Sequence, residues 1–178
     1  MVSNEEIKVT KRNGRGPESL NIDKIHSMVG FATEGITGVS ASHVEMNSGL
    51  QFFDGISTDD IQQILIKSAN DLISLESPNY QFVAARLLLF SLRKKLNHRL
   101  WEHPKFIDHI KKLIDLGLYD KGILENYTEA EIDRMGMWID HERDYSFTYA
   151  GLRQVMDKYL VQDRSTGEIF ETPQFMYM

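Results

Sequence analysis

The stretch from Pro78 to Lys95, PNYQFVAARLLLFSLRKK, constrains the fold more than any other part of the sequence. Ser77 before the proline predicts a helix start, because a hydroxyl caps free N–H groups and proline lacks an N–H to satisfy. From Phe82 to Leu92 the side chains are apolar on nearly every face, with Arg86 and Ser91 as the only interruptions. A helix that is apolar all round must be surrounded by other elements. The sequence therefore predicts a buried central helix in a mainly α-helical fold.

The basic end of this stretch, Arg93, Lys94 and Lys95, has two interpretations. Cations at a helix C-terminus complement the helix dipole, and the residues alone favour that interpretation. The alternative is that a buried helix delivers a fixed cation to a phosphate site.

Composition narrows the class of protein. With 178 residues, 42% hydrophobic and 26% charged, the chain has an ordinary globular composition. It has no apolar run of the roughly 18 residues that a membrane span needs, and its N-terminus lacks the pattern of a signal peptide. The absence of cysteine excludes disulfides, thiolate zinc sites and cysteine nucleophiles within this chain, and it fits a cytoplasmic location.

The net charge of −6 is unevenly distributed. Residues 1–100 are neutral, with 11 basic and 11 acidic side chains, whereas residues 101–178 have 9 basic and 15 acidic ones. Neither half has the basic excess of a nucleic-acid-binding protein, so we expect no DNA or RNA partner.

Residues 1–97 predict a four-helix bundle capped by a small β-sheet. Residues 7–12 alternate as a strand does, Asn13-Gly14 is a hairpin turn signal, and residues 18–21 form the returning strand. Helices follow over 22–34, ended by Gly35, over 42–52, and from Ser57 with an apolar stripe that reaches Leu72 and Ile73. Ser42 with Glu45, and Ser57 with Asp60, have the spacing of capping boxes.

Residues 98–178 predict an incomplete helical domain with a β-hairpin. Periodicity is lost from residue 97 to Pro104, where we place the domain boundary. Helices are predicted over 106–116, over 128–139 with a capping box from Thr128 to Glu131, and over 147–159. A hairpin over 159–170 follows, and Pro173 opens a further helix in whose first turn the sequence ends. We expect such a domain to be incomplete.

Four residues of the first region are candidates for phosphate binding: Lys11 and Arg12 on the strand, Lys24 in a first helical turn, and Thr58 at a helix start. A lysine in a first turn is opposed by the helix dipole unless an anion lies between them, and helix N-termini bind anions. The alternative is that all four are solvated surface residues, which the residues alone favour.

No other motif indicates an active site. The histidines, among them His98, His103 and His109, lack metal-ligand spacing and are expected on the surface or in the core. The run from Asp140 to Asp144, DHERD, is interpreted as a charged, salt-bridged connection between helices. The sequence contains no Walker-type or GxGxxG loop.

The sequence resembles the N-terminal part of the large subunit of class I ribonucleoside-diphosphate reductases. The resemblance covers nearly the whole chain, and many short pieces occur in the family's order. They are VTKRNG, NIDKI, FFDGISTDDI, PNYQFVAARLLLFSLRKK, GLYD, YTEAEI, DHERDYSFTYAGL and KYLVQDRSTGEIFETPQF.

This resemblance implies that residues 1–97 form an ATP-cone, which binds ATP as activator or dATP as inhibitor of the whole enzyme, with Mg²⁺. It implies nucleotide contacts in the strand, the start of the first helix, the start of the third helix and the end of the central helix. These residues are Lys11, Arg12, Glu18, Ser19, Leu20, Asn21, Ile22, Asp23, Lys24, Thr58, Ile61, Gln62 and Lys94. On this basis Lys24 and Lys94 meet phosphates, and Asn21 and Thr58 lie nearer the base.

Two departures and one absence qualify the resemblance. Many bacterial members have a histidine at the positions of Gln62 and Ser91, which bear on dATP inhibition more than on binding. The family's chemistry needs cysteines that this chain does not contain, so we expect no catalytic residues and no reduction of ribonucleotides by the chain alone. Its implied partners are the remainder of the large subunit and the radical-generating small subunit. The chain is then a shortened gene product, a piece of a split subunit or a cut fragment.

Three other classes of protein share features with this sequence. A repressor that joins an ATP-cone to a zinc ribbon needs cysteine pairs and a basic surface, which are missing. An anaerobic glycyl-radical reductase can also begin with an ATP-cone, but residues 119–175 resemble class I. The third alternative, a structural or docking fragment whose cone no longer binds nucleotide, is left open by the sequence.

Overall fold

The computed structural model describes residues 7–10, 16–49, 51–97 and 101–178. It divides the chain into two compact units, residues 1–88 with 148–150, and residues 89–147 with 151–178. The predicted fold class, mainly helical with a small sheet, is confirmed. The predicted domain boundary near residue 97 stays a prediction, because the helix that precedes it begins in the first unit and ends in the second.

The first unit contains a three-stranded sheet in the order β2-β1-β3. The antiparallel pair β1 (Lys8–Thr10) and β2 (Glu18–Ser19) confirms the predicted strands, whereas the turn predicted at Asn13-Gly14 lies outside the described residues. The short β3 (Ile56–Ser57), which the sequence did not predict, pairs in parallel with β1. The positive φ of 84° at Gly55, which glycine adopts without strain, directs its N–H to the Lys8 carbonyl at 2.9 Å.

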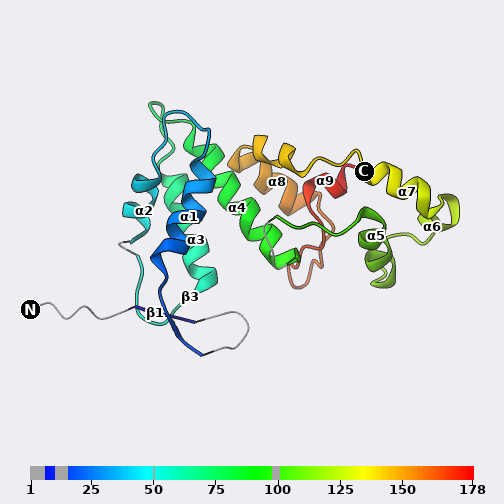
Figure 1. The fold of residues 1–178 in the computed structure, drawn as a ribbon, viewed down its shortest axis with the longest axis horizontal. Coiled ribbons are helices and arrows are strands. Elements are labelled where there is room, and N and C mark those ends of the chain that lie inside the picture. The colour runs from blue at the N-terminus through cyan, green and yellow to red at the C-terminus, as the bar shows by residue number, and fades with distance from the viewer. Residues whose placement is uncertain (1–6, 11–15, 50, 98–100) are drawn as a thin grey trace, which may run out of the picture. The chain divides into compact units, whose positions relative to one another are not determined.

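Helices α1 (Ile22–Thr33), α2 (Ala41–Gly49) and α3 (Thr58–Asp71) lie side by side in the first unit, with the first half of α4 (Tyr80–Asn97) (Figure 1). Both α1 and α3 pack on α2. Apolar side chains that repeat at helical spacing form the core of this bundle. They include Ile25, Val29, Ala32, Val44, Leu65, Ala69, Val83, Ala84 and Leu87.

Several predicted details of these helices were wrong. Since α2 begins at Ala41, Ser42 lies inside the helix and does not cap it. The apolar stripe of α3 ends at Ala69, because Leu72 is the C-cap and Ile73 is exposed. The central helix begins at Tyr80, after a tight turn at Pro78 whose carbonyl accepts a hydrogen bond from the Gln81 N–H.

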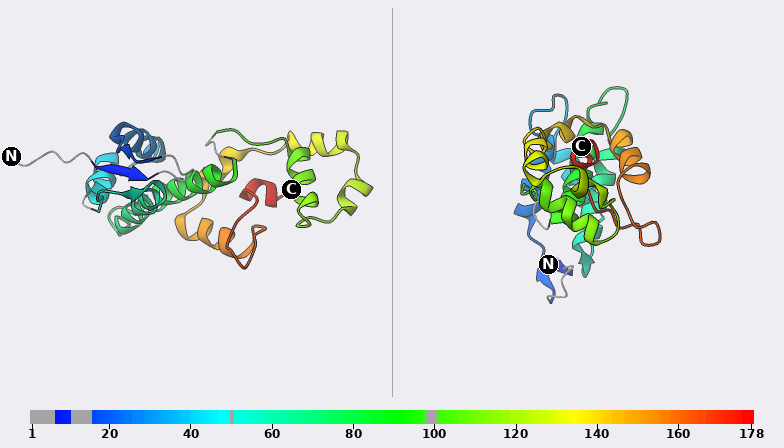
Figure 2. Two further views of the ribbon diagram at one scale, coloured as in Figure 1. Left: turned by 90° about the horizontal axis from the view of Figure 1, so that it is seen from below. Right: turned by 90° about the vertical axis from the view of Figure 1, so that its right-hand side faces the viewer.

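The second unit contains the rest of α4, then α5 (Phe106–Asp115), α6 (Gly122–Asn126), α7 (Glu129–Gly136), the 3₁₀ helix η1 (His141–Ser146), most of α8 (Tyr149–Lys158) and α9 (Pro173–Met176). Figure 2 shows these elements from two further sides. α5 packs against α7, and α9 packs against η1. Their shared apolar cluster consists of Phe106, Ile107, Ile110, Ile132 and Phe175.

The longer helices of this unit confirm the prediction, whereas two of its short helices were not predicted. The capping box of Thr128 and Glu131 is present, and α9 opens on Pro173 as predicted. α6 and η1 were not predicted. The predicted hairpin over 159–170 is confirmed as a short one. Gln162 and Ile169 form an antiparallel bridge, and the Phe170 N–H donates to the Val161 carbonyl and the Asp163 N–H to the Glu168 carbonyl, each at 2.9 Å.

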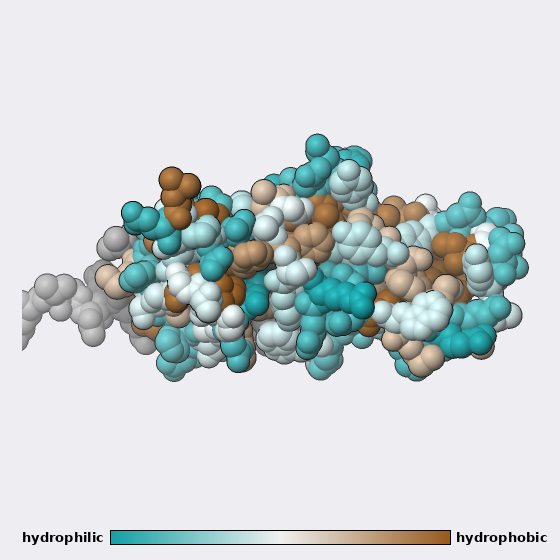
Figure 3. Space-filling view, turned by 90° about the horizontal axis from the view of Figure 1, so that it is seen from above, coloured by the Kyte–Doolittle hydropathy of each residue, from teal (hydrophilic) through white to brown (hydrophobic). Residues whose placement is uncertain are grey.

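Within the described residues, no helix combines the length and the apolar character needed to cross a membrane. On the face in Figure 3, hydrophobic residues gather in separate patches among hydrophilic ones. Many apolar side chains of the described residues are buried in the core of their unit, whereas others, such as Ile22, Leu75 and Trp138, are exposed.

Candidate functional site

The sheet brings the beginnings of α1 and α3 to the two sides of β1. β2 leads into α1 and pairs with β1 through Lys8 and Ser19, while β3 leads into α3 and pairs through Thr10 and Ser57. The Leu20 N–H extends the first pairing by donating to the Ile7 carbonyl at 2.8 Å. Two helix N-termini therefore flank one strand, and helix N-termini are favourable positions for anions.

The first turn of α1 is built by its cap. The side-chain oxygen of Asn21 accepts a hydrogen bond from the Lys24 N–H at 2.9 Å, which satisfies one of the free donors of the first turn. Ile22, Asp23 and Lys24 are exposed, and Ile22 keeps 70% of its surface open to solvent. An exposed isoleucine beside a lysine ammonium offers an apolar surface and a cation at one helix start.

Glu18 and Ser19 of β2 are exposed, and Leu20 is half-buried. In the predicted segment from Glu18 to Lys24, every residue is therefore exposed except the half-buried Leu20. Lys11 and Arg12, which were predicted to join it, lie outside the described residues.

The beginning of α3 has a different character. Ser57 caps it, with its hydroxyl accepting from the Asp60 N–H at 3.0 Å and donating to the Asp60 carboxylate at 2.6 Å. Asp59 also lies in the first turn, and Thr58 is half-buried. Two carboxylates already complement the dipole here, so this N-terminus is less open to a phosphate than that of α1.

Two further predicted residues lie in the core of the first unit. Ile61 is 6% exposed and Gln62 is 5% exposed. The Gln62 amide donates to the Leu87 carbonyl at 2.9 Å, which ties α3 to α4. Gln62 thus satisfies its polar group inside the bundle, and its predicted contact with a nucleotide stays a prediction.

Lys94, the last predicted contact, is exposed near the end of α4, whereas the preceding Arg93 is buried. The Arg93 guanidinium pairs with the Asp144 carboxylate at 3.3 Å and also donates to the Tyr145 hydroxyl at 3.0 Å. Of the three basic residues at the helix end, Arg93 therefore serves the core of the second unit. Ser91, the second departure from the family pattern, is also buried.

The DHERD connection is salt-bridged as predicted, but its main partner is distant in sequence. Asp140 caps η1 by accepting from the Glu142 N–H at 3.0 Å, and Asp144 receives Arg93 and, at 2.8 Å, the Gln174 amide. Sequence reasoning missed the role of Arg93 and Asp144, because their separation of 51 residues leaves no local signal.

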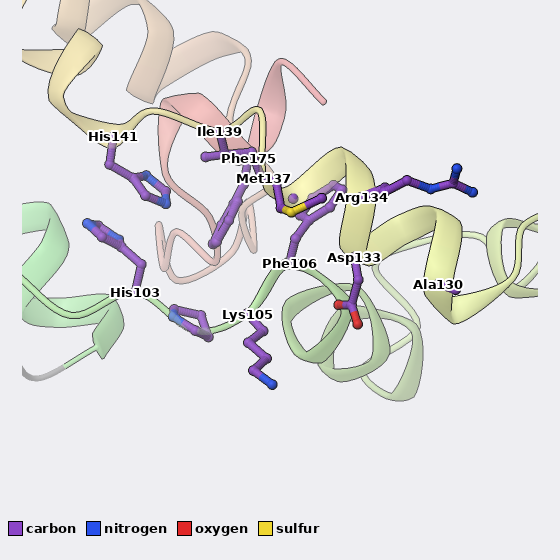
Figure 4. Close-up of a pocket in the computed structure, with 12 residues that line it drawn as sticks. His103, Lys105, Phe106, Ala130, Asp133, Arg134, Met137, Ile139, His141 and Phe175 are labelled. Carbon is purple, nitrogen blue, oxygen red and sulfur yellow. The ribbon is translucent and has the colours of Figure 1, made fainter.

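A pocket of about 660 Å³ in the second unit is a separate candidate (Figure 4). Its aromatic wall includes Phe106 and Phe175, whose ring centroids lie 5.6 Å apart, and His103 stacked on His141 at 3.6 Å. Figure 4 shows the basic ends of Lys105 and Arg134 directed away from these rings, and His103 and His141 facing one another.

Three histidines of this region are kept neutral by their surroundings: His109 is buried, and His103 and His141 are half-buried. Burial lowers the pKa of His103 to about 4, and the nearby positive charge of Arg93 adds to this shift. Burial also lowers the pKa of His141 to about 3, with further contributions from His103 and Arg93. Burial likewise lowers the pKa of His109 to about 4, and its ring stacks on Phe175 at 4.2 Å. A pocket walled by neutral rings lacks the fixed positive charge that a phosphate needs, so it does not compete with the start of α1.

Metal binding by the protein alone finds no support in the described part of the chain, where no three His, Asp or Glu side chains are grouped to hold an ion. A divalent ion at the start of α1 would therefore have to arrive with a ligand that carries its own oxygen donors.

Comparison with known proteins decides the family. The model of the ATP cone domain family matches residues 7–95, which covers both helix starts and the whole of the sheet. This chain belongs to the ATP-cone family. The capped, lysine-bearing start of α1 is therefore part of an ATP-cone.

The resemblance to reductases is also confirmed. Over 175 residues the chain is 49% identical to ribonucleoside-diphosphate reductase 1 subunit alpha of Escherichia coli (strain K12), covering 98% of this chain and 23% of the relative. It is 44% identical over 172 residues to the reductase alpha subunit of Enterobacteria phage T4, covering 97% and 22%. The alpha subunit of Helicobacter pylori is 39% identical over 173 residues, covering 97% and 21%. The chain thus spans less than a quarter of the length of these relatives.

Proposed function

We propose that this ATP-cone binds ATP or dATP as an allosteric effector, with Mg²⁺ coordinated by the nucleotide phosphates. The observation that carries the proposal is the family match over residues 7–95, which coincides with an exposed, Asn-capped helix start that presents Lys24. Helix N-termini with a nearby cation are suited to phosphates.

The start of α1 fits the parts of a nucleotide. The Lys24 ammonium and the unpaired first-turn N–H groups suit phosphate oxygens, since charge-assisted hydrogen bonds are the stronger ones. The exposed Ile22 offers an apolar surface for a base. Glu18, Ser19 and Asn21 contribute polar groups for the sugar and the base edge. Lys11, Arg12, Thr58, Ile61, Gln62 and Lys94 complete the proposed set of contacts.

We propose that the cone acts within a reductase that converts ribonucleotides to deoxyribonucleotides for DNA synthesis, in the cytoplasm. Its partners are then the remainder of a large subunit, which supplies the catalytic cysteines, and the radical-generating small subunit. Because the chain contains no cysteine, it is inactive alone and contributes regulation only. The proposal includes altered inhibition by dATP, because Gln62 and Ser91 replace the histidines of many bacterial members.

The test is a calorimetric titration of the folded chain with ATP and with dATP in magnesium, in parallel with Lys24→Ala. A matched control is Lys67→Ala, because Lys67 is also an exposed lysine of the first unit but lies far along α3 from its start. The proposal expects nucleotide binding that is lost in Lys24→Ala and kept in Lys67→Ala. Equal loss in both variants, or no binding by the unmodified chain, contradicts it.

A structural or docking fragment without nucleotide binding is the second candidate. Two observations favour it: Gln62 is occupied by the Leu87 carbonyl, and Asp59 and Asp60 place negative charge at the start of α3. The titration separates the two candidates, since a docking fragment gives no heat with either nucleotide while remaining folded.

A further inference from the structure

The pocket in Figure 4 is a groove with an aromatic base and a charged rim, and all of its lining residues belong to the second unit. Phe106 and Phe175 form the base; they are 8% and 4% exposed. The volume of about 660 Å³ lies within the range of about 300 to 1,000 Å³ that is usual for binding pockets. The exposed lining residues of the rim are Pro104, Lys105, Ala130, Asp133, Arg134 and Met137.

Two consecutive apolar side chains are exposed on the connection that follows α7. Met137 lines the groove and is 74% exposed, and Trp138, the next residue, is 72% exposed. Methionine and tryptophan are among the residue types enriched in protein–protein interfaces. A buried aromatic base with exposed apolar side chains beside it resembles the centre of such an interface, where an anchoring side chain enters a pocket.

The rim of the groove carries a net positive charge. Lys105 and Arg134 both line it, and neither forms a salt bridge with any residue that the structure describes. Against these two cations, Asp133 is the one carboxylate among the described lining residues. Figure 4 shows the two basic ends directed away from the rings, so they suit anions at the rim and not at the base.

The beginning of α5 adds a second preference for an anion at this rim. Lys105 is its N-cap residue, and no side chain in the described part of the chain caps this helix. The His109 N–H makes the first intrahelical bond, to the Lys105 carbonyl at 3.0 Å, so the N–H groups before it have no acceptor within the helix. Asp108 in the first turn complements the dipole in part. A carboxylate from outside would complement it further and pair with the Lys105 ammonium.

We propose that this groove docks a segment of a partner protein that presents an aromatic side chain between carboxylates. The aromatic side chain packs on Phe106 and Phe175, since pairs of aromatic rings gain energy beyond the area that they bury. The carboxylates meet Arg134 and, at the start of α5, Lys105. The proposal is independent of nucleotide binding, because none of these residues belongs to the first unit.

Charge makes this choice of partner testable. The whole chain has a net charge of −6, and residues 101–178 have 9 basic and 15 acidic side chains. At long range the protein therefore attracts basic peptides and repels acidic ones. A preference for an acidic peptide can come only from a local group of cations, such as that at the rim of the groove.

The test is an amide NMR titration of the full chain, at physiological salt, with three blocked tripeptides: Glu-Phe-Glu, Lys-Phe-Lys and Glu-Ala-Glu. We expect Glu-Phe-Glu to shift the residues that line the groove and to bind about tenfold more tightly than either of the others. Lys-Phe-Lys keeps the ring but reverses the charge, and Glu-Ala-Glu keeps the charge but removes the ring.

Three variants of exposed residues locate the contacts without disturbing the core. Lys105→Gln should weaken binding of Glu-Phe-Glu about three- to tenfold, because it removes one charge-assisted contact. Ala130→Glu adds a carboxylate to the lining and should weaken Glu-Phe-Glu while strengthening Lys-Phe-Lys. The matched control is Lys158→Gln, since Lys158 is an exposed lysine at the end of α8 that does not line the groove; it should change nothing.

Each part of the proposal can fail separately. Lys-Phe-Lys binding as tightly as Glu-Phe-Glu, or equal effects of Lys105→Gln and Lys158→Gln, overturns the acidic partner. Glu-Ala-Glu binding as tightly as Glu-Phe-Glu overturns the aromatic anchor. Shifts confined to residues outside the groove, or no shifts at millimolar peptide, overturn the docking site. Groove shifts that depend on protein concentration without peptide also overturn the proposal, because they indicate a second copy of the chain as the occupant.

Discussion

Lowering the pH should destabilise the second unit through His109, because the surroundings of this side chain disfavour its protonated form. The side chain is 4% exposed, its ring stacks on Phe175 at 4.2 Å, and Tyr119 meets its edge at 6.0 Å. The buried Nε2 atom has no hydrogen-bond partner. Burial, reinforced by the positive charge of Lys112, therefore lowers the pKa of His109 from 6.5 to about 4.

The magnitude follows from linkage. Between pH 6.5 and pH 4 the unfolded chain binds a proton at residue 109 that the folded chain does not, so the free energy of unfolding falls as the pH falls. A difference of about 2.5 in pKa, at about 1.4 kcal/mol per unit, corresponds to about 3 kcal/mol in total. This contribution is complete above pH 6.5 and is lost progressively below it.

The assay is urea unfolding, followed by tryptophan fluorescence, from pH 7.5 to pH 4.5 for the unmodified chain and His109→Phe. Both tryptophans, Trp101 and Trp138, belong to the second unit and report on it. Phenylalanine keeps the ring stack but cannot be protonated. The unmodified chain should lose about 2 to 3 kcal/mol more than the variant over this range, because the carboxylates and other histidines are common to both. Parallel pH profiles would refute the reasoning.

Three smaller predictions concern local structure, each measured as the change in the free energy of unfolding. Gly136→Ala should destabilise by about 1 to 3 kcal/mol, because its new Cβ atom would lie 3.0 Å from Cβ of Phe106, and an unchanged stability would contradict the tight α5–α7 packing. Gly30→Ala on α1 should instead stabilise by about 0.5 to 1 kcal/mol, because no atom lies within 4 Å of the new Cβ and alanine favours a helix. A lower stability of this variant would contradict the open space found beside Gly30. Thr128→Ala removes a capping box and should cost about 1 kcal/mol, whereas a neutral result would mean that the Glu131 hydrogen bonds do not hold the helix start.

The parts of the fold that the sequence predicted well depend on neighbouring residues. The caps at Ser57 and Thr128, the stop at Gly35 and the helix opened by Pro173 are set by contacts within a few positions, which periodicity and spacing record. The wrong cap at Ser42 shows the limit of such spacing, because a capping pattern inside a helix looks the same as one at its start.

The parts that the sequence did not predict depend on distant residues. β3 exists because two residues after Gly55 pair with β1, 47 positions earlier at Val9 and Ile56. The ion pair of Arg93 with Asp144 joins residues 51 positions apart, and the stack of His103 on His141 joins residues 38 positions apart. No local pattern carries these contacts, since only the tertiary fold brings the residues together.

The candidate site likewise contains features set by neighbouring residues and features set by distant ones. Lys24 in a first helical turn was visible in the sequence, because the start of that helix is a local signal. The burial of Gln62 against Leu87 was not, because it depends on how α3 meets α4.

The most direct test of the nucleotide site is an amide NMR spectrum of the chain, assigned residue by residue and recorded with and without ATP in magnesium. The account predicts that the largest shifts fall on residues 18–24 and on Thr58 and Lys94, while the aromatic pocket around Phe106 and Phe175 is unaffected. Shifts confined to that pocket, or an unchanged spectrum at saturating ATP, would contradict it.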